Sequence, residues 1–100
     1  MTARLVVLAS GYGTNLQAII DACESKQIDA QVVGVVSDKH EAFALNRAQC
    51  HNVETAVVAA KPHETRQQYD ACLTQIVDMW QPHIVVLAGF MRVLSNSFLS

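Results

Sequence analysis

The segment Ser10–Leu16 places a Gly-Tyr-Gly turn directly between an apolar run and an amphipathic one. Leu5–Ala9 is continuously apolar, which is typical of a buried strand, and Thr14–Ser25 carries its apolar residues at helical spacing. The N–H groups at a helix N-terminus have no partner inside the helix, and the helix dipole adds about half a positive charge there. Because glycine has no Cβ, the main chain of Gly11–Gly13 can turn sharply and approach an anion. The segment therefore predicts a strand, a turn and a helix that together bind a phosphate.

The alternation of strand-like and helix-like segments continues along the chain. Further strands are predicted at Gln31–Ser37, Val53–Val58 and His83–Ala88, and further helices at Glu41–Cys50 and Glu64–Trp80. This order, with continuously apolar strands, implies a parallel sheet with right-handed crossovers. The predicted fold class is α/β, a Rossmann-like parallel sheet in strand order 3-2-1-4 with helices on both faces. Ligands bind such sheets beyond the carboxyl ends of the strands, so we expect the glycine turn and Gly89–Leu94 to meet at one cleft.

The length of 100 residues corresponds to one domain, and we expect residues 1–100 to be a single N-terminal phosphate-binding subdomain. The predicted fourth strand, His83–Ala88, would leave a long apolar edge, which soluble proteins normally avoid. We therefore expect the sheet to be incomplete at its C-terminal side, with a C-terminal catalytic portion absent. An uncovered edge of this kind also favours self-association.

The composition excludes several classes of protein. The chain is 51% hydrophobic and has a net charge of −2 with scattered Lys and Arg, which gives no electrostatic reason to expect a nucleic acid or an anionic membrane as partner. No apolar stretch approaches the ~20 residues that cross a bilayer, and no signal peptide is visible. Cys23, Cys50 and Cys72 lack C-x-x-C spacing, so we predict buried, reduced thiols and a cytoplasmic protein.

The glycine turn can be interpreted in more than one way. A dinucleotide fingerprint needs a third glycine at the position of Leu16, so NAD binding is disfavoured, and no Gly-Lys-Ser/Thr follows to make a Walker A loop. Thr14 and Gln17 also have the spacing of a capping box, which would explain these residues without any ligand. A cap needs no preceding Gly-x-Gly and leaves other N–H groups free, so phosphate binding is the favoured interpretation.

The remaining side chains that could carry chemistry are dispersed. The four histidines lie in separate connections or element ends without ligand spacing, so no metal site is predicted: His40, His51, His63 and His83. We expect Asp70 and Asp78 to be solvated, and Tyr69 and Trp80 to lie in the core. Arg66 lies in the first turn of a helix, where a cation gains nothing from the dipole. Two interpretations of it remain open: an ordinary surface arginine, or a residue that binds an anionic ligand.

Three segments resemble one known family. Gly11–Ile19 resembles the G-x-G-[ST]-N-x-x-A-[IL] segment of phosphoribosylglycinamide formyltransferase, and Val85–Leu94 resembles that family's L-A-G-[FY]-M-[RK]-[IVL]-L segment. Ser37–Lys39 resembles its S-[ND]-[KR] turn. The resemblance implies the transfer of a formyl group from 10-formyltetrahydrofolate to the amine of 5-phosphoribosylglycinamide, in purine biosynthesis and without a metal.

The resemblance also implies site residues. The substrate phosphate would be held by main-chain N–H groups of Gly13, Thr14 and Asn15, and the folate by Arg66, Met91, Arg92, Val93 and Leu94. No catalytic residue is implied within the chain, because the family's Asn-x-His and later Asp lie beyond Ser100, so we expect these 100 residues to be inactive alone. The alternatives are a stand-alone phosphate- or nucleotide-binding module, and the related formyltetrahydrofolate hydrolase or methionyl-tRNA formyltransferase, whose first loops lack this Gly-x-Gly-Thr-Asn.

Overall fold

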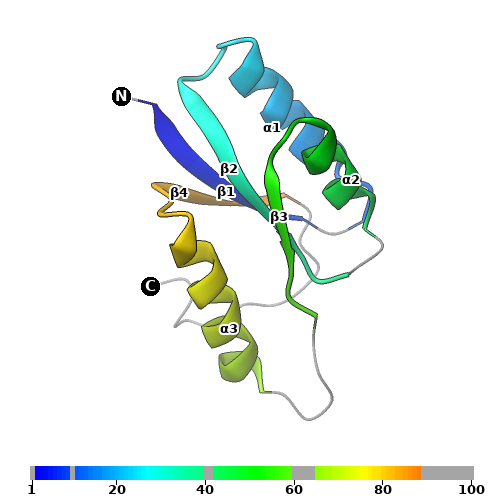
Figure 1. Cartoon of the computed structure of the whole chain (residues 1–100), viewed down its shortest axis with the longest axis vertical. Helices are drawn as coiled ribbons and strands as arrows, with labels where there is room; N and C mark the ends of the chain where they lie inside the picture. The colour runs from blue at the N-terminus through cyan, green and yellow to red at the C-terminus, as the bar shows by residue number, and fades with distance from the viewer. Residues whose placement is uncertain (1, 10, 40–41, 60–64, 89–100) are drawn as a thin grey trace.

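The computed structural model describes residues 2–9, 11–39, 42–59 and 65–88. Within these ranges strands and helices alternate in the predicted order (Figure 1). The elements are β1 (Ala3–Ala9), α1 (Thr14–Glu24), β2 (Ala30–Ser37), α2 (Phe43–Cys50), β3 (Glu54–Val57), α3 (Arg66–Met79) and β4 (Ile84–Ala88). Every described element lies where the sequence predicts it, with ends that differ by a few residues.

The described strands form one parallel sheet in the order β3-β2-β1-β4. In the centre of the sheet Leu8 of β1 pairs with Val36 of β2 on one side and with Leu87 of β4 on the other. This confirms the predicted strand order. Because the strands are parallel, their carboxyl ends lie at one edge, and the turn that follows β1 is flanked by the ends of β2 and β4.

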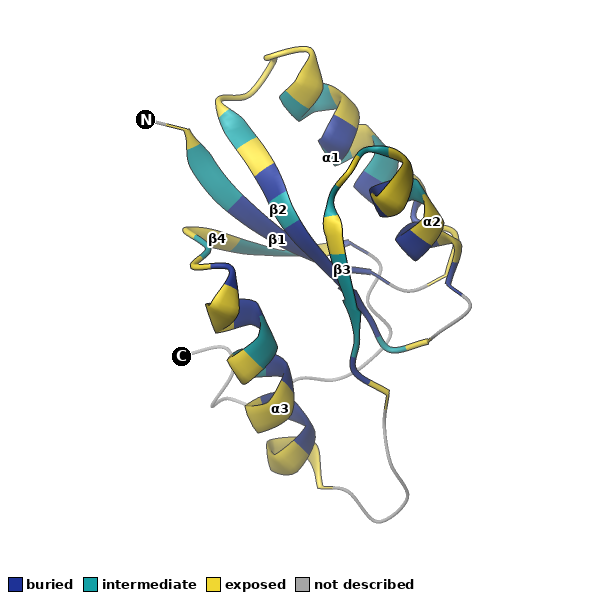
Figure 2. Ribbon diagram, viewed as in Figure 1, coloured by how far each residue is buried: buried dark blue, intermediate teal, exposed yellow. Residues whose placement is uncertain are grey.

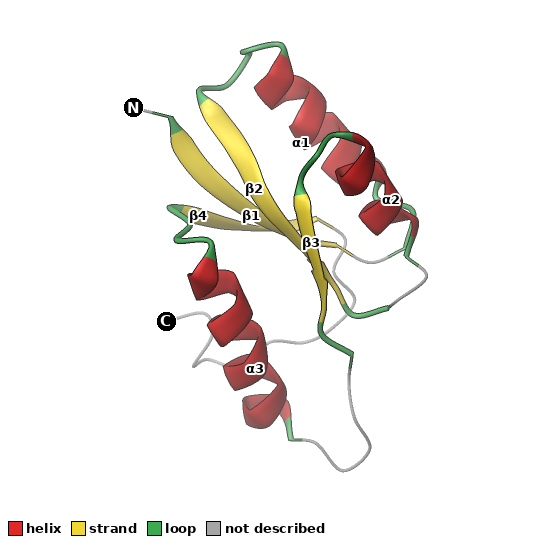
Figure 3. Ribbon diagram, viewed as in Figure 1, coloured by secondary structure: helices red, strands yellow, loops and turns green. Residues whose placement is uncertain are grey.

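The helices cover both faces of the sheet, with α1 and α2 on one face and α3 on the other (Figures 2 and 3). Leu5 and Val7 of β1 pack into the core under α1 and α2, whereas Val6 and Leu8 pack into the core over α3. Successive side chains of a strand point to opposite faces, so a strand buried on both faces must be apolar at every position. The continuous apolar run of β1 follows from this.

The start of α3 is defined by a capping box that the sequence analysis did not identify. The Thr65 hydroxyl accepts a hydrogen bond from the Gln68 N–H at 3.1 Å, and the Thr65 N–H donates to Gln68 Oε1 at 2.8 Å. Each side chain satisfies a backbone N–H that the helix itself leaves unpaired. Arg66 is therefore the first residue of α3.

The buried side of α3 corrects one prediction and confirms another. Tyr69 and Trp80 are buried, as predicted, and the Tyr69 hydroxyl donates to the Val58 carbonyl at 2.6 Å. Asp70 is only 1% exposed, so the prediction that it is solvated is wrong, whereas Asp78 is exposed. Asp70 is buried because it shares the sheet-facing side of the helix with Tyr69 and the residues one and two turns further on.

The cysteines are free but less buried than predicted. Cys50 and Cys72 are exposed, so the prediction of buried thiols is wrong for both, and Cys23 is half-buried. Cys72 is exposed because the stripe of α3 that faces the sheet passes through Leu73 instead. Burial raises the pKa of the Cys23 thiol, and the negative charge of Glu24 raises it further. Since the thiolate is the nucleophile, Cys23 is a poor one at neutral pH.

Among the described strands β4 has one neighbour, β1. Its side chains Ile84 and Leu87 are each 53% exposed, so the strand presents apolar surface at the edge of the described sheet, as predicted. The self-association that such an edge favours stays a prediction.

Gly34 allows β2 to contact the indole of Trp80, and this contact is open to test. A Cβ on Gly34 would overlap the Trp80 ring, which is held by a hydrogen bond from its Nε1 to Glu54 Oε2 at 2.7 Å. Gly34→Ala should lower the free energy of unfolding by about 1–3 kcal/mol through overpacking. Gln31→Ala, at an exposed position of the same strand, should change it by less than about 0.5 kcal/mol. Denaturant titration measures both, and similar effects of the two substitutions would contradict the packing of Gly34 on Trp80.

Candidate functional site

The turn between β1 and α1 is built on two glycines with left-handed backbone. Gly11 has a φ of +71° and Gly13 a φ of +73°, which residues with a Cβ rarely adopt. Tyr12 lies between them with its side chain 77% exposed. The two glycines are therefore required by the path of the main chain from the sheet into α1.

The N-terminus of α1 has unpaired donors. Gly13 is the N-cap residue, and the first helical hydrogen bond runs from the Gln17 N–H to the Gly13 carbonyl at 2.9 Å. The N–H groups of Thr14, Asn15 and Leu16 consequently have no acceptor within the helix. Thr14 and Asn15 are exposed, so solvent or a ligand can reach this end of α1. Unpaired donors at the positive end of a helix can bind an anion.

The capping box considered for Thr14 and Gln17 is absent, so that interpretation is wrong. No side chain in the described residues caps α1. Thr14 is already inside the helix, and the Gln17 amide donates to Asp21 Oδ1 at 3.0 Å instead of turning back to the N-cap. The reason is the left-handed backbone of Gly13, which takes the N-cap position one residue earlier than the capping box requires.

Helix α2 holds the other side of the turn. The Gly11 carbonyl accepts from the Ala44 N–H at 3.1 Å, and the Tyr12 carbonyl accepts from Arg47 Nε at 2.6 Å. The sequence analysis did not identify Arg47 as part of the site. The contact joins residues 35 apart in the chain, and no motif includes that arginine, so the sequence carries no signal that could have found it.

A hollow of about 360 Å³ lies beside the turn and is lined by Gly11, Tyr12, Lys39, Ala42 and Phe43. The Lys39 N–H donates to the buried Ser37 hydroxyl at 3.2 Å. The turn after β2, which resembles a family segment in sequence, is therefore adjacent to the glycine turn. Both lie at the carboxyl edge of the sheet, where parallel α/β folds bind ligands.

The predicted folate-binding residues are only partly described. Arg66 is exposed at the start of α3, on the face of the sheet opposite α1. Because α3 runs back along the sheet between two parallel strands, it begins near the carboxyl edge. Met91, Arg92, Val93 and Leu94 lie outside the described residues. The expectation that Gly89–Leu94 joins the glycine turn in one cleft therefore stays a prediction.

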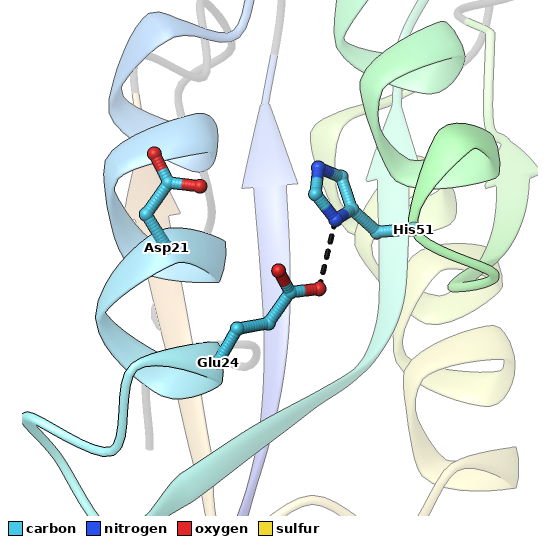
Figure 4. A group of neighbouring side chains, drawn as sticks. All are labelled: Asp21, Glu24 and His51. Carbon is cyan, nitrogen blue, oxygen red and sulfur yellow. Dashed lines mark hydrogen bonds and ion pairs between the residues drawn. The ribbon is translucent and has the colours of Figure 1, made fainter.

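A cluster of Asp21, Glu24 and His51 lies between α1 and the end of α2 (Figure 4). One potential ligand atom from each side chain lies within 4.8 Å of the other two. His51 Nδ1 is 2.8 Å from Glu24 Oε2, and His51 Nε2 is 3.2 Å from the Gln17 amide nitrogen, so both ring nitrogens already contact protein atoms. Since the Gln17 amide also donates to Asp21, these contacts account for the cluster as a hydrogen-bonded network that joins α1 to the end of α2.

The other histidines do not extend this cluster in the described part of the chain. His83 Nδ1 accepts from the Arg4 N–H at 2.9 Å, and His40 and His63 lie outside the described residues. A second hollow, of about 210 Å³, is lined by Cys23, Glu24 and His51 together with the beginning of β2. It is at the amino edge of the sheet, at the far end of α1 from the glycine turn.

Comparison with known proteins connects this geometry to one family. A family model described as Formyl transferase matches residues 3–100. The chain is 48% identical over 96 residues to the phosphoribosylglycinamide formyltransferase of Escherichia coli (strain K12). The match covers 96% of this chain and 45% of that protein. It is 38% identical over 96 residues to the human trifunctional purine biosynthetic protein adenosine-3, of which it covers 10%. The chain thus spans about half the length of the first relative and one tenth of the length of the second.

Solved structures agree with the fold. The glycinamide ribonucleotide transformylase 1 from Symbiobacterium toebii matches with a TM-score of 0.93 and 36% identity, over 98% of this chain and 46% of that one. The phosphoribosylglycinamide formyltransferase from Brucella melitensis matches with a TM-score of 0.93 and 33% identity, over all of this chain and 52% of that one. The sheet and helices described above are therefore shared with these enzymes.

Alanine substitutions at Gly11 and Gly13 should separate backbone strain from steric overlap. Each places a Cβ on a residue of positive φ, at a cost of about 1–2 kcal/mol. At Gly13 the new Cβ would also lie 2.7 Å from the Cα and Cβ of Ala44, whereas at Gly11 it meets no atom within 4 Å. Gly13→Ala should therefore reduce the free energy of unfolding by about 1–3 kcal/mol more than Gly11→Ala. Equal losses in denaturant titration would contradict the close packing of the turn on α2.

Proposed function

Because the chain belongs to the formyl transferase family, we propose that the complete protein transfers a formyl group from 10-formyltetrahydrofolate to the amine of 5-phosphoribosylglycinamide in purine biosynthesis. The observation that carries this proposal is the N-terminus of α1, where unpaired N–H groups follow a glycine turn at the carboxyl edge of the sheet. The high identity to phosphoribosylglycinamide formyltransferases supports the choice of substrate.

The phosphate of the substrate binds to the main chain of the turn. The N–H groups of Gly13, Thr14 and Asn15 donate to its oxygens, and the dipole of α1 favours its charge. Hydrogen bonds to a charged acceptor are shorter and stronger than those between neutral groups. Recognition through the backbone leaves the side chains of Thr14 and Asn15, both exposed, free to contact the ribose.

The formyl folate binds on the other side of the same edge. The guanidinium of Arg66 is exposed at the start of α3 and suits a carboxylate of the folate, since arginine pairs with carboxylates through two parallel hydrogen bonds. Met91, Arg92, Val93 and Leu94 complete this site by their resemblance to the family. The groups that polarise the formyl group and move protons lie outside these 100 residues, and the reaction uses no metal.

The partners in this proposal are the two small-molecule substrates. The net charge of −2 supports the exclusion of nucleic acid and of an anionic membrane surface. None of the described helices is long and apolar enough to cross a membrane. The three free cysteines support a reducing cytoplasm as the site of action, and the exposed edge of β4 supports self-association.

Removal of the phosphate from the substrate should abolish most of its binding. We expect calorimetry on the complete protein to show saturable binding of 5-phosphoribosylglycinamide. The same compound without its phosphate should bind at least about a hundredfold more weakly, because several hydrogen bonds to a charged group are lost. Equal affinities for the two compounds would refute phosphate recognition at the turn. The absence of any binding or formyl transfer would refute the proposed function.

The 100 residues alone should not catalyse formyl transfer. They contain the proposed phosphate-binding turn but none of the groups to which we assign proton transfer. The measurement is turnover by the purified 100-residue chain, free of full-length enzyme, with the complete protein as the positive control. Turnover by the short chain would show that it contains a catalytic group that the sequence analysis missed.

A further inference from the structure

Arg47 links three parts of the structure around the glycine turn. Its Nε donates to the Tyr12 carbonyl at 2.6 Å, and its Nη1 donates to Gln17 Oε1 of α1 at 3.3 Å. The guanidinium carbon lies 5.0 Å from the centre of the Phe43 ring, within the range of a cation–π contact. A single guanidinium, on a half-buried arginine, thus contacts the turn, α1 and its own helix α2.

The bond to Tyr12 determines the direction of a neighbouring donor. In a planar trans peptide the carbonyl of one residue and the N–H of the next point in opposite directions, and no described peptide bond is cis. The Tyr12 carbonyl therefore shares its peptide plane with the Gly13 N–H. By holding that carbonyl at 2.6 Å, Arg47 directs the Gly13 N–H away from its own guanidinium.

The peptide planes on either side are held by other groups. The Gly11 carbonyl is bonded to the Ala44 N–H, and the Gly13 carbonyl to the Gln17 N–H. Both of these partners are backbone groups of helices, whereas the central plane depends on one side chain. With a glycine of positive φ on each side of Tyr12, this central peptide has the most freedom to rotate when its partner is removed.

We infer that Arg47 is a positioning residue for phosphate binding, which acts by aiming the Gly13 N–H at the phosphate. This inference rests on the proposed function, because it takes the phosphate of 5-phosphoribosylglycinamide as the ligand. Arg47 has no contact with the substrate in this role. Its charge adds to the positive end of α1, but the fixed orientation of the peptide plane is what a preorganised donor requires.

The test compares three variants of the complete protein. Arg47→Met keeps an apolar stem of similar length but removes both the donors and the charge. Arg47→Lys keeps the charge but cannot donate to Tyr12 and Gln17 through a rigid fork. Arg4→Met is the matched control, because Arg4 also donates to a backbone carbonyl, that of Trp80 at 2.6 Å, but lies at the opposite end of β1.

Arg47→Met should raise the dissociation constant and the KM for 5-phosphoribosylglycinamide at least about tenfold, the loss expected for one hydrogen bond to a charged acceptor. The KM for the formyl folate and kcat should stay within about twofold. This is expected when the phosphate contact is lost equally from the ground state and from the transition state. Arg47→Lys should fall between wild type and Arg47→Met. In nitrogen–proton correlation spectra the Gly13 amide should shift on addition of inorganic phosphate to the wild type, and much less in Arg47→Met.

Several results would overturn the inference. Ribotide affinity within twofold of wild type in Arg47→Met would exclude a positioning role, and full affinity in Arg47→Lys would show that charge alone carries the effect. An equal loss in Arg4→Met would show that general destabilisation is responsible. Failure of the wild type to bind either the ribotide or phosphate would instead refute the proposed function, and the inference with it.

Discussion

The docking of the glycine turn on α2 is the contact on which the candidate site depends. Gly13 has no room for a Cβ against Ala44, and the carbonyls of Gly11 and Tyr12 are bonded to Ala44 and Arg47. Each bonded carbonyl sets the direction of the N–H that follows it. Helix α2, which contributes no proposed ligand contact of its own, therefore sets the direction of the Gly13 N–H, one of the proposed phosphate donors.

The sheet makes this contact possible because it brings α1 and α2 to the same face. The crossovers from β1 to β2 and from β2 to β3 place both helices over one core, while α3 packs on the other side. A parallel sheet with right-handed connections then puts the turns after β1 and β2 next to each other at the carboxyl edge. The hollow beside the glycine turn is lined from both of these turns and from α2.

Most of the architecture was predictable because it depends on periodicity and burial along the chain. Continuous apolar runs predicted strands covered on both faces, and helical spacing in Glu64–Trp80 correctly placed Tyr69 and Trp80 in the core. The errors concern the choice between adjacent positions of a helix. Asp70 is buried and Cys72 exposed because the sheet-facing side of α3 includes Asp70 and Leu73 but not Cys72. At the start of α1 the left-handed backbone of Gly13 replaced the capping box expected at Thr14.

The sequence by itself determined the strand order, the two glycines of the turn and the location of the candidate phosphate site, because these follow from local backbone requirements and from the order of the elements. Only the tertiary structure decided which way the donors of the turn point. That direction depends on Arg47 and Ala44, which lie more than thirty residues further along the chain than the Gly11 and Tyr12 carbonyls they bind. A hydrogen bond across such a separation has no counterpart in local sequence pattern, since the fold alone brings its partners together.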